Sequence, residues 1–119
     1  MTTSIKAKKY GNKKVEADGF VFDSTKEFNR YYELKLLQRA GRIRKLEVHP
    51  KFELQPKFID KSGVAHRAIT YSGDFAYIEN DLHVVEDVKS EMTRKLAQYR
   101  DKKKMFLYKF PDIIFKEVL

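Results

Sequence analysis

The residues of this sequence whose types and spacing best suit a chemical site are Asp74, Asp87 and Lys89. The dipeptide Asn80-Asp81 has the composition of a tight turn, and it separates two stretches rich in β-branched and aromatic residues. A two-residue loop there would place Asp74 directly opposite Asp87 in a β-hairpin, with their Cβ atoms roughly 4.5 to 5.5 Å apart. A four-residue loop centred on the same point keeps this pairing, whereas a loop of three or five residues shifts it by one and breaks it.

A divalent metal ion would resolve the conflict that this pairing creates. Two facing carboxylates repel, so one of them must take up a proton unless a cation lies between them. Carboxylate oxygens are the ligands that Mg²⁺ and Mn²⁺ prefer. Lys89 lies about 6.6 Å further along the same face, where its ammonium could orient an attacking water or stabilise charge on a phosphate. We therefore predict that Asp74 and Asp87 hold a metal ion and that Lys89 assists.

Each of these residues also has a simpler interpretation. The two aspartates could be solvated on a surface hairpin or paired with some of the many lysines, and Lys89 could be an ordinary strand-end lysine. Glu86 competes with Asp87 for the ligand role, but choosing it would leave Val88 in the place of the lysine and would put the acid on the opposite face. Apolar residues line both faces of the hairpin, so we expect it to be central in its sheet.

The elements that precede this hairpin are predicted from turn residues and hydrophobic periodicity. Residues 14–22 alternate around Asp18-Gly19, which is typical of a tight hairpin. A helix is predicted from Ser24, which has capping-box spacing to Glu27, to Gly41. In the segment 42–58, two prolines exclude a helix and separate two short extended pieces that we expect to be edge strands. The helix has apolar residues at helical spacing, namely Phe28, Tyr31, Tyr32, Leu36 and Leu37.

The second half of the chain is predicted to contain the hairpin, a helix and a last strand. The hairpin strands cover 66–79 and 82–89. The helix runs from about Thr93 to Lys109 and is closed by Pro111, and the sequence DIIFKEVL then forms a strand. The helix residues expected to face inward are Leu96, Tyr99, Phe106, Leu107 and Phe110.

Glu27 has two interpretations from sequence alone. It shares a helical face with Tyr31 and Leu34, which favours an inward side chain at the site, but a capping role would also explain it. The run Lys102 to Lys104 is predicted to be a solvated face, with phosphate contact as the alternative. The histidines have no metal-ligand spacing, so we predict structural roles for His49, His66 and His83.

The composition fits one domain, predicted over residues 14–119, after a flexible basic segment of residues 1–13. The absence of cysteine excludes disulfides, thiolate metal sites and a cysteine nucleophile. No apolar run is long enough for a signal peptide or a membrane span, so we expect a cytoplasmic protein without a membrane partner. The sequence has 25 Lys and Arg against 17 Asp and Glu, and this net charge of +8 favours a polyanionic partner, with nucleic acid the first candidate.

The sequence Gly73-Asp74, followed after twelve residues by Asp87-Val88-Lys89, resembles the motif of the PD-(D/E)XK nuclease superfamily. The core of that superfamily is a helix, three antiparallel strands, a helix and a further strand, which is similar to the order predicted from residue 24 to residue 118. The resemblance implies an α/β (α+β) fold with a restriction-endonuclease-like core, in which two main helices flank a central mixed β-sheet. Three departures are Gly73 in the position of Pro, Asp87 where Glu is often found, and Ser90 where Gly is common.

The likeness is greatest to small phage-encoded nucleases and to the TnsA-like and endonuclease I-like branches. It implies that Glu27 and the carbonyl of Val88 join Asp74 and Asp87 as metal ligands, with Mg²⁺ as the cofactor and Mn²⁺ as a substitute. The expected activity is DNA cleavage in phage recombination or replication, including Holliday junctions, which would require a homodimer. The alternatives are a nuclease subunit of a transposition or restriction system and a non-catalytic DNA-binding protein.

Overall fold

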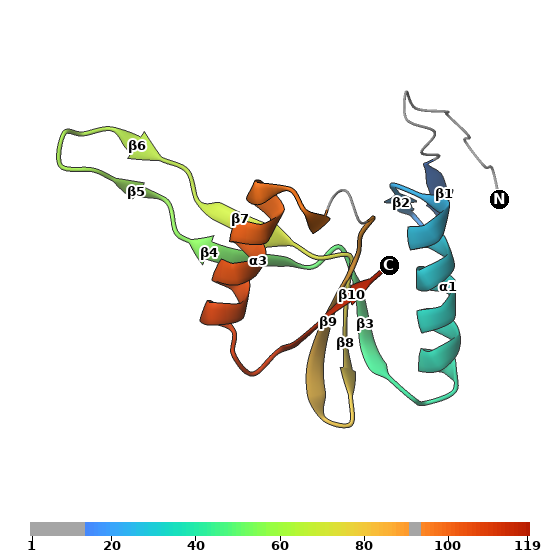
Figure 1. Cartoon of the computed structure of the whole chain (residues 1–119). Coiled ribbons are helices and arrows are strands. Elements are labelled where there is room, and N and C mark those ends of the chain that lie inside the picture. Colours follow the sequence, from blue (N-terminus) through green and yellow to red (C-terminus); the bar gives the residue numbers. More distant parts are fainter. Residues whose placement is uncertain (1–13, 91–93) are drawn as a thin grey trace.

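The computed structural model describes residues 14–90 and 94–119, so the predicted basic segment 1–13 lies outside the described residues. Its centre is a four-stranded mixed sheet with the order β10-β9-β8-β3 (Figure 1). Strand β8 (Phe75–Glu79) pairs antiparallel with both β3 (Arg44–Val48) and β9 (Leu82–Val88), whereas β10 (Ile114–Val118) runs parallel to β9. Helices α1 (Thr25–Arg39) and α3 (Ala97–Lys109) lie on either side of this sheet, which confirms the predicted mixed α/β class.

The hairpin of β8 and β9 has the predicted turn and register. Asn80 and Asp81 both have positive φ, of 52° and 63°, as a two-residue type I′ turn requires. Glu79 pairs with Leu82, and the pairing continues in the predicted register to Phe75 and Glu86. One face packs against α1 through Phe75, Tyr77 and Val84, and the other packs against α3 through Ala76 and Val85. The hairpin is therefore central and covered on both faces, as predicted.

Helix α1 begins and ends where the sequence predicts. The Ser24 hydroxyl caps it by accepting from the Glu27 N–H at 3.1 Å, and Gly41 follows the helix at a φ of 77°. The buried residues of α1 are Glu27, Tyr31 and Leu34. Of the apolar residues at helical spacing, Tyr32 and Leu36 are instead exposed.

The second main helix is shorter than predicted. Leu96 has an extended backbone, with φ −68° and ψ 132°, so α3 begins at Ala97 and not near Thr93, which itself lies outside the described residues. Phe106 is fully buried, and Tyr99 and Phe110 pack beside it. Leu96 and Leu107 are exposed, so the prediction that they face inward is wrong.

The predicted N-terminal hairpin is also present. Strands β1 (Val15–Ala17) and β2 (Phe20–Phe22) pair around Asp18 and Gly19, whose φ angles are 54° and 83°. This short hairpin caps one end of the α1 layer, because Phe22 is fully buried against Tyr31.

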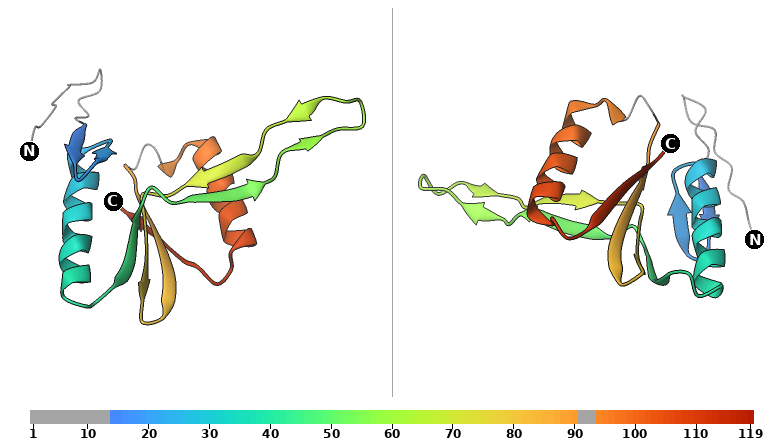
Figure 2. Two further views of the ribbon diagram at one scale, coloured as in Figure 1. Left: turned by 180° about the vertical axis from the view of Figure 1, so that it is seen from behind. Right: turned by 60° about the horizontal axis from the view of Figure 1, so that its bottom comes forward.

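A two-stranded ribbon projects from the body, and the sequence analysis did not predict it (Figure 2). Its inner part pairs β4 (Lys51–Gln55) with β7 (Ile69–Ser72), and its outer part pairs β5 (Phe58–Ile59) with β6 (Ala65–His66). The predicted single strand 66–79 is therefore wrong, because residues 66–72 belong to the ribbon and only 75–79 to the central sheet. The prediction of edge strands in 42–58 is correct for β3, whereas β4 lies in the ribbon. We call residues 51–72 the ribbon.

None of the helices in the described part of the chain is long and apolar enough to cross a membrane.

Candidate metal centre

The candidate site lies where the ribbon leaves the central sheet. Two connections bend there side by side, at His49-Pro50 between β3 and β4 and at Gly73-Asp74 between β7 and β8. They are joined by backbone hydrogen bonds from the His49 N–H to the Asp74 carbonyl at 2.9 Å and from the Gly73 N–H to the Pro50 carbonyl at 3.0 Å. The bend is tight at residue 73, since a Cβ on that glycine would lie 3.0 Å from a Val85 methyl. Glycine thus allows the ribbon connection to pass close to β9.

Glu27 comes to this bend from the first turn of α1. Glu27 is only 4% exposed, and its Oε1 lies 2.9 Å from Nε2 of His49. The Glu27 side chain therefore points inward, as its helical face predicted. Its backbone N–H also donates to the Ser24 cap. His49 reaches Glu27 because its backbone turns at a φ of 55°.

Asp74 completes a group of three possible ligands. One ligand atom from each of Glu27, His49 and Asp74 lies within 4.8 Å of the others. One Asp74 oxygen, Oδ2, accepts from the Val88 N–H at 2.6 Å. Burial, followed by the charges of Asp87 and Glu27, raises the pKa of Asp74 to about 8. The protein therefore concentrates negative charge here that a proton or a cation must offset.

The predicted ladder pair between Asp74 and Asp87 does not form. The ladder ends at Phe75 and Glu86, and the Asp74 N–H instead donates to the Glu86 carbonyl at 3.0 Å. The bend that starts the ribbon takes Asp74 out of the strand. The two carboxyl groups nevertheless remain close enough for the Asp87 charge to raise the pKa of Asp74.

Asp87 is fully buried on β9, and its two oxygens differ. Oδ2 accepts from the Tyr71 hydroxyl, and burial together with the Asp87 charge raises the pKa of that tyrosine, which keeps it a proton donor. Oδ1 is buried and accepts no hydrogen bond from the described residues, although the Lys89 ammonium lies 3.1 Å away. A buried carboxylate oxygen without a hydrogen bond is costly, and the positive charge of Lys89 offsets part of that cost.

Lys89 is held at this site by three neighbours. Its backbone N–H donates to the Val118 carbonyl of β10 at 2.9 Å. Its side-chain Nζ contacts Asp87 and lies 5.1 Å from the centre of the Tyr99 ring. The Tyr99 hydroxyl donates to Glu117 Oε2 at 2.6 Å. The cation–π geometry and the ion pair fix the direction of the lysine side chain.

Glu86, the rival of Asp87 in the sequence, lies on the opposite face of β9. It is fully buried and receives two hydrogen bonds from Arg30, at 2.7 and 2.6 Å, and another from the Tyr77 hydroxyl. The hydrogen bonds to Glu86 raise the pKa of Arg30 above its usual range. Glu86 is therefore engaged in a structural ion pair between α1 and the sheet, away from the candidate site.

The predicted site residues line two adjoining cavities. Glu27, Asp74, Val88 and Lys89 line one of about 350 Å³. Asp87 lines the next, of about 470 Å³, and Lys89 lines both. The structure thus brings all the predicted residues to one region, but it separates Asp87 from the group of Glu27, His49 and Asp74.

The donor set fits a divalent cation. Each of the three carboxyl groups has one oxygen fixed by the protein, through His49, the Val88 N–H and the Tyr71 hydroxyl respectively. The second oxygens of Glu27 and Asp74 are then available to a hard cation such as Mg²⁺ or Mn²⁺, whereas Oδ1 of Asp87 already has the Lys89 ammonium 3.1 Å away. An imidazole among the donors favours a first-row transition metal over Mg²⁺.

Sequence reasoning missed three contributors, His49, Tyr71 and Tyr99. The predicted structural role of His49 agrees with its hydrogen bond to Glu27, but the structure also places it among the possible ligands. Its position after a strand and before Pro50 was a signal for a bend, but no spacing connected that bend with Glu27. Nothing in the local pattern marked the two tyrosines.

The chain belongs to the family described as "Protein of unknown function (DUF1064)", whose model matches residues 7–118. No curated protein and no solved structure matches the chain.

Proposed function

We propose that this member of the DUF1064 family is a metal-dependent endonuclease that hydrolyses DNA phosphodiester bonds. The observation that carries the proposal is the convergence of three buried or half-buried carboxyl groups, an imidazole and an oriented lysine at one bend of the sheet. Asp74 has a strongly raised pKa, and Asp87 Oδ1 is buried beside the Lys89 ammonium without a hydrogen bond. Such perturbed groups cluster at functional sites.

The protein residues have separable roles in this proposal. Glu27, His49 and Asp74 would hold a divalent ion, with Asp87 Oδ1 and the Val88 carbonyl as the further ligands that the resemblance implies. A bound divalent ion would supply Lewis-acid activation of water and compensation of phosphate charge.

Lys89 places a positive charge at the junction of the two cavities, where it can stabilise the charge that develops on a phosphate. Tyr71 donates to Oδ2 of Asp87, and Oδ1 of the same carboxylate lies 3.1 Å from the Lys89 ammonium.

Two further observations support a nucleic-acid substrate. The net charge of +8 favours a polyanion, and the order of helix, antiparallel strands, helix and parallel strand agrees with the resemblance to PD-(D/E)XK nucleases. The finer expectations belong to the same proposal: Mg²⁺ or Mn²⁺ as cofactor, a role in phage DNA recombination or replication, a branched DNA substrate and a homodimer.

The test is cleavage of a labelled four-way junction, a linear duplex and single-stranded DNA, each with Mg²⁺, Mn²⁺ or EDTA. Asp87→Asn and Lys89→Ala are compared with wild type, and Asp101→Asn serves as a matched control at an exposed position of α3. We expect metal-dependent cutting that both site variants lose and the control keeps, with DNA binding retained in all. A preference for the junction would support the branched substrate.

The rival is a DNA-binding protein without catalysis. It predicts binding that falls with salt, persists in EDTA and is unchanged in Asp87→Asn, with no cutting of any substrate. That result would overturn the endonuclease proposal.

A further inference from the structure

A third cavity continues the depression that contains the candidate site. The first cavity shares Lys89 with the second, and the second shares Tyr99 with the third, which has a volume of about 580 Å³. The three cavities therefore follow one another from the candidate metal centre, past Lys89 and Tyr99, to the face of α3. We call this row of adjoining cavities the depression, and its length suits an extended ligand.

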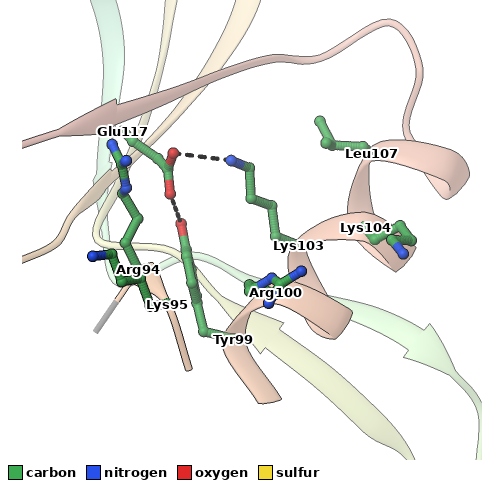
Figure 3. Close-up of a pocket in the computed structure, with 8 residues that line it drawn as sticks. All are labelled: Arg94, Lys95, Tyr99, Arg100, Lys103, Lys104, Leu107 and Glu117. Atoms are coloured by element: carbon green, nitrogen blue, oxygen red, sulfur yellow. Dashed lines mark hydrogen bonds and ion pairs between the residues drawn. The ribbon is translucent and has the colours of Figure 1, made fainter. Parts of the chain in front are cut away.

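The third cavity is strongly basic (Figure 3). One carboxylate, that of Glu117, lies among its cations, and it is already engaged by the Tyr99 hydroxyl at 2.6 Å and by Lys103 Nζ at 2.9 Å. The local excess of positive charge is therefore available to an external anion. The five cations that line the cavity are Arg94, Lys95, Arg100, Lys103 and Lys104.

We propose that this depression is the path of the DNA backbone, and that the basic cavity of α3 binds the phosphates that flank the cleavage point. This inference rests on the proposed function for its direction, because one end of the path is the candidate metal centre. Lys89 and Tyr99 lie at the two junctions, so a strand that follows the depression passes the lysine before it reaches the helix.

The chemistry of the cavity favours a phosphodiester backbone. Its cations come from successive turns of α3 and from the segment before that helix, so they are spaced along a line. A nucleic-acid backbone is a line of repeating anions. Proteins that bind nucleic acid without recognising bases usually do so with a positively charged groove that follows the backbone. Lys103 is held in place by Glu117, whereas Arg100 and Lys104 are exposed and can reach a ligand.

The test measures binding of a short labelled DNA duplex by fluorescence anisotropy in EDTA, over a series of salt concentrations. The variant Arg100→Gln/Lys104→Gln removes two cations of the cavity. The matched control Arg39→Gln/Arg42→Gln removes two exposed arginines at the far end of α1, where Arg39 lies roughly 18 Å along the helix from Glu27. Circular dichroism checks that both variants fold. If Arg100→Gln/Lys104→Gln does not fold, Lys95→Gln/Lys104→Gln takes its place.

We expect the cavity variant to bind DNA at least about tenfold more weakly at low salt. We also expect the magnitude of its slope of log K against log salt to be smaller by about 2, while the control stays close to wild type. If the cavity variant and the control behave alike, the path is overturned, and metal-dependent cutting by wild type would still support the endonuclease. If wild type binds DNA but never cuts it, while the cavity variant alone is weakened, the path is supported and the endonuclease is overturned. Absence of DNA binding by wild type overturns both.

Discussion

Replacing Asp74 by asparagine is expected to stabilise the metal-free protein at neutral pH, although it removes a candidate ligand. Burial and the charges of Asp87 and Glu27 raise the pKa of Asp74 from 3.8 to about 8. The folded chain therefore holds a proton, between about pH 4 and pH 8, that the unfolded chain releases. Because the folded state binds more protons in this range, the free energy of unfolding falls as the pH rises.

The size of the effect follows from this difference of one proton. Each pH unit changes the free energy of unfolding by about 1.4 kcal/mol, so Asp74 accounts for a loss of about 2.7 kcal/mol between pH 5.5 and pH 7.5. For a domain of this length that loss corresponds to a fall in Tm of roughly 10 °C. The side chain introduced by Asp74→Asn would not titrate, and its amide can still accept from the Val88 N–H while donating toward Asp87.

The assay is thermal unfolding of wild type, Asp74→Asn and the exposed control Asp101→Asn, in EDTA across this pH range. We expect Tm to fall with pH in wild type and in the control, but much less in Asp74→Asn. Mn²⁺ at a hundredfold excess over its Kd should restore about 2.7 kcal/mol to wild type at pH 7.5 and little to Asp74→Asn. Equal pH slopes in all three proteins, or equal stabilisation by Mn²⁺, would refute the reasoning.

Three further variants test neighbouring parts of the structure. Gly73→Ala should lower the free energy of unfolding by about 1 to 3 kcal/mol in urea denaturation, because the added methyl group crowds β9; an unchanged midpoint would contradict the tight bend. Arg30→Met should cost about 3 to 5 kcal/mol by leaving Glu86 buried without its partner, and Arg30→Met/Glu86→Gln should recover most of that loss; a double variant as unstable as the single one would show that the ion pair is not the cause. His49→Ala should raise the Mn²⁺ concentration needed for half-maximal thermal stabilisation about tenfold, while the exposed His83→Ala leaves it unchanged; equal midpoints would exclude His49 as a ligand.

The local features of this fold were accessible from the sequence because short-range rules determine them. Two dipeptides with positive φ, Asp18-Gly19 and Asn80-Asp81, fixed two hairpins, and the second also fixed the register that separates Glu86 from Asp87. The cap at Ser24 and the glycine at position 41 fixed the ends of α1. Each of these signals depends on residues close together in the chain.

The features that the sequence did not reveal depend on long-range packing. The stretch 66–79 alternates like one strand, yet it pairs with β4 before Gly73 and with β9 after it, and only the position of β4 explains the change. His49 meets Glu27 because β3 ends beside the first turn of α1, which no local spacing encodes. The pairing of β7 with β4 also bends the chain at Gly73, and this bend removed Asp74 from the predicted pair with Asp87.

The outer part of the ribbon can move without disturbing the site at the bend. The inner strands β4 and β7 pack on α3, where Phe52 contacts Phe106 and Lys109 Nζ donates to the Glu53 carbonyl at 2.8 Å. Tyr71, which donates to Asp87, belongs to this packed inner part. The five residues from Pro56 to Asp60 span roughly 16 Å when extended, so a swing of about 10° that begins at Pro56 would carry the ribbon tip roughly 3 Å. The tip can therefore adapt to whatever it touches while the residues of the candidate site keep their positions.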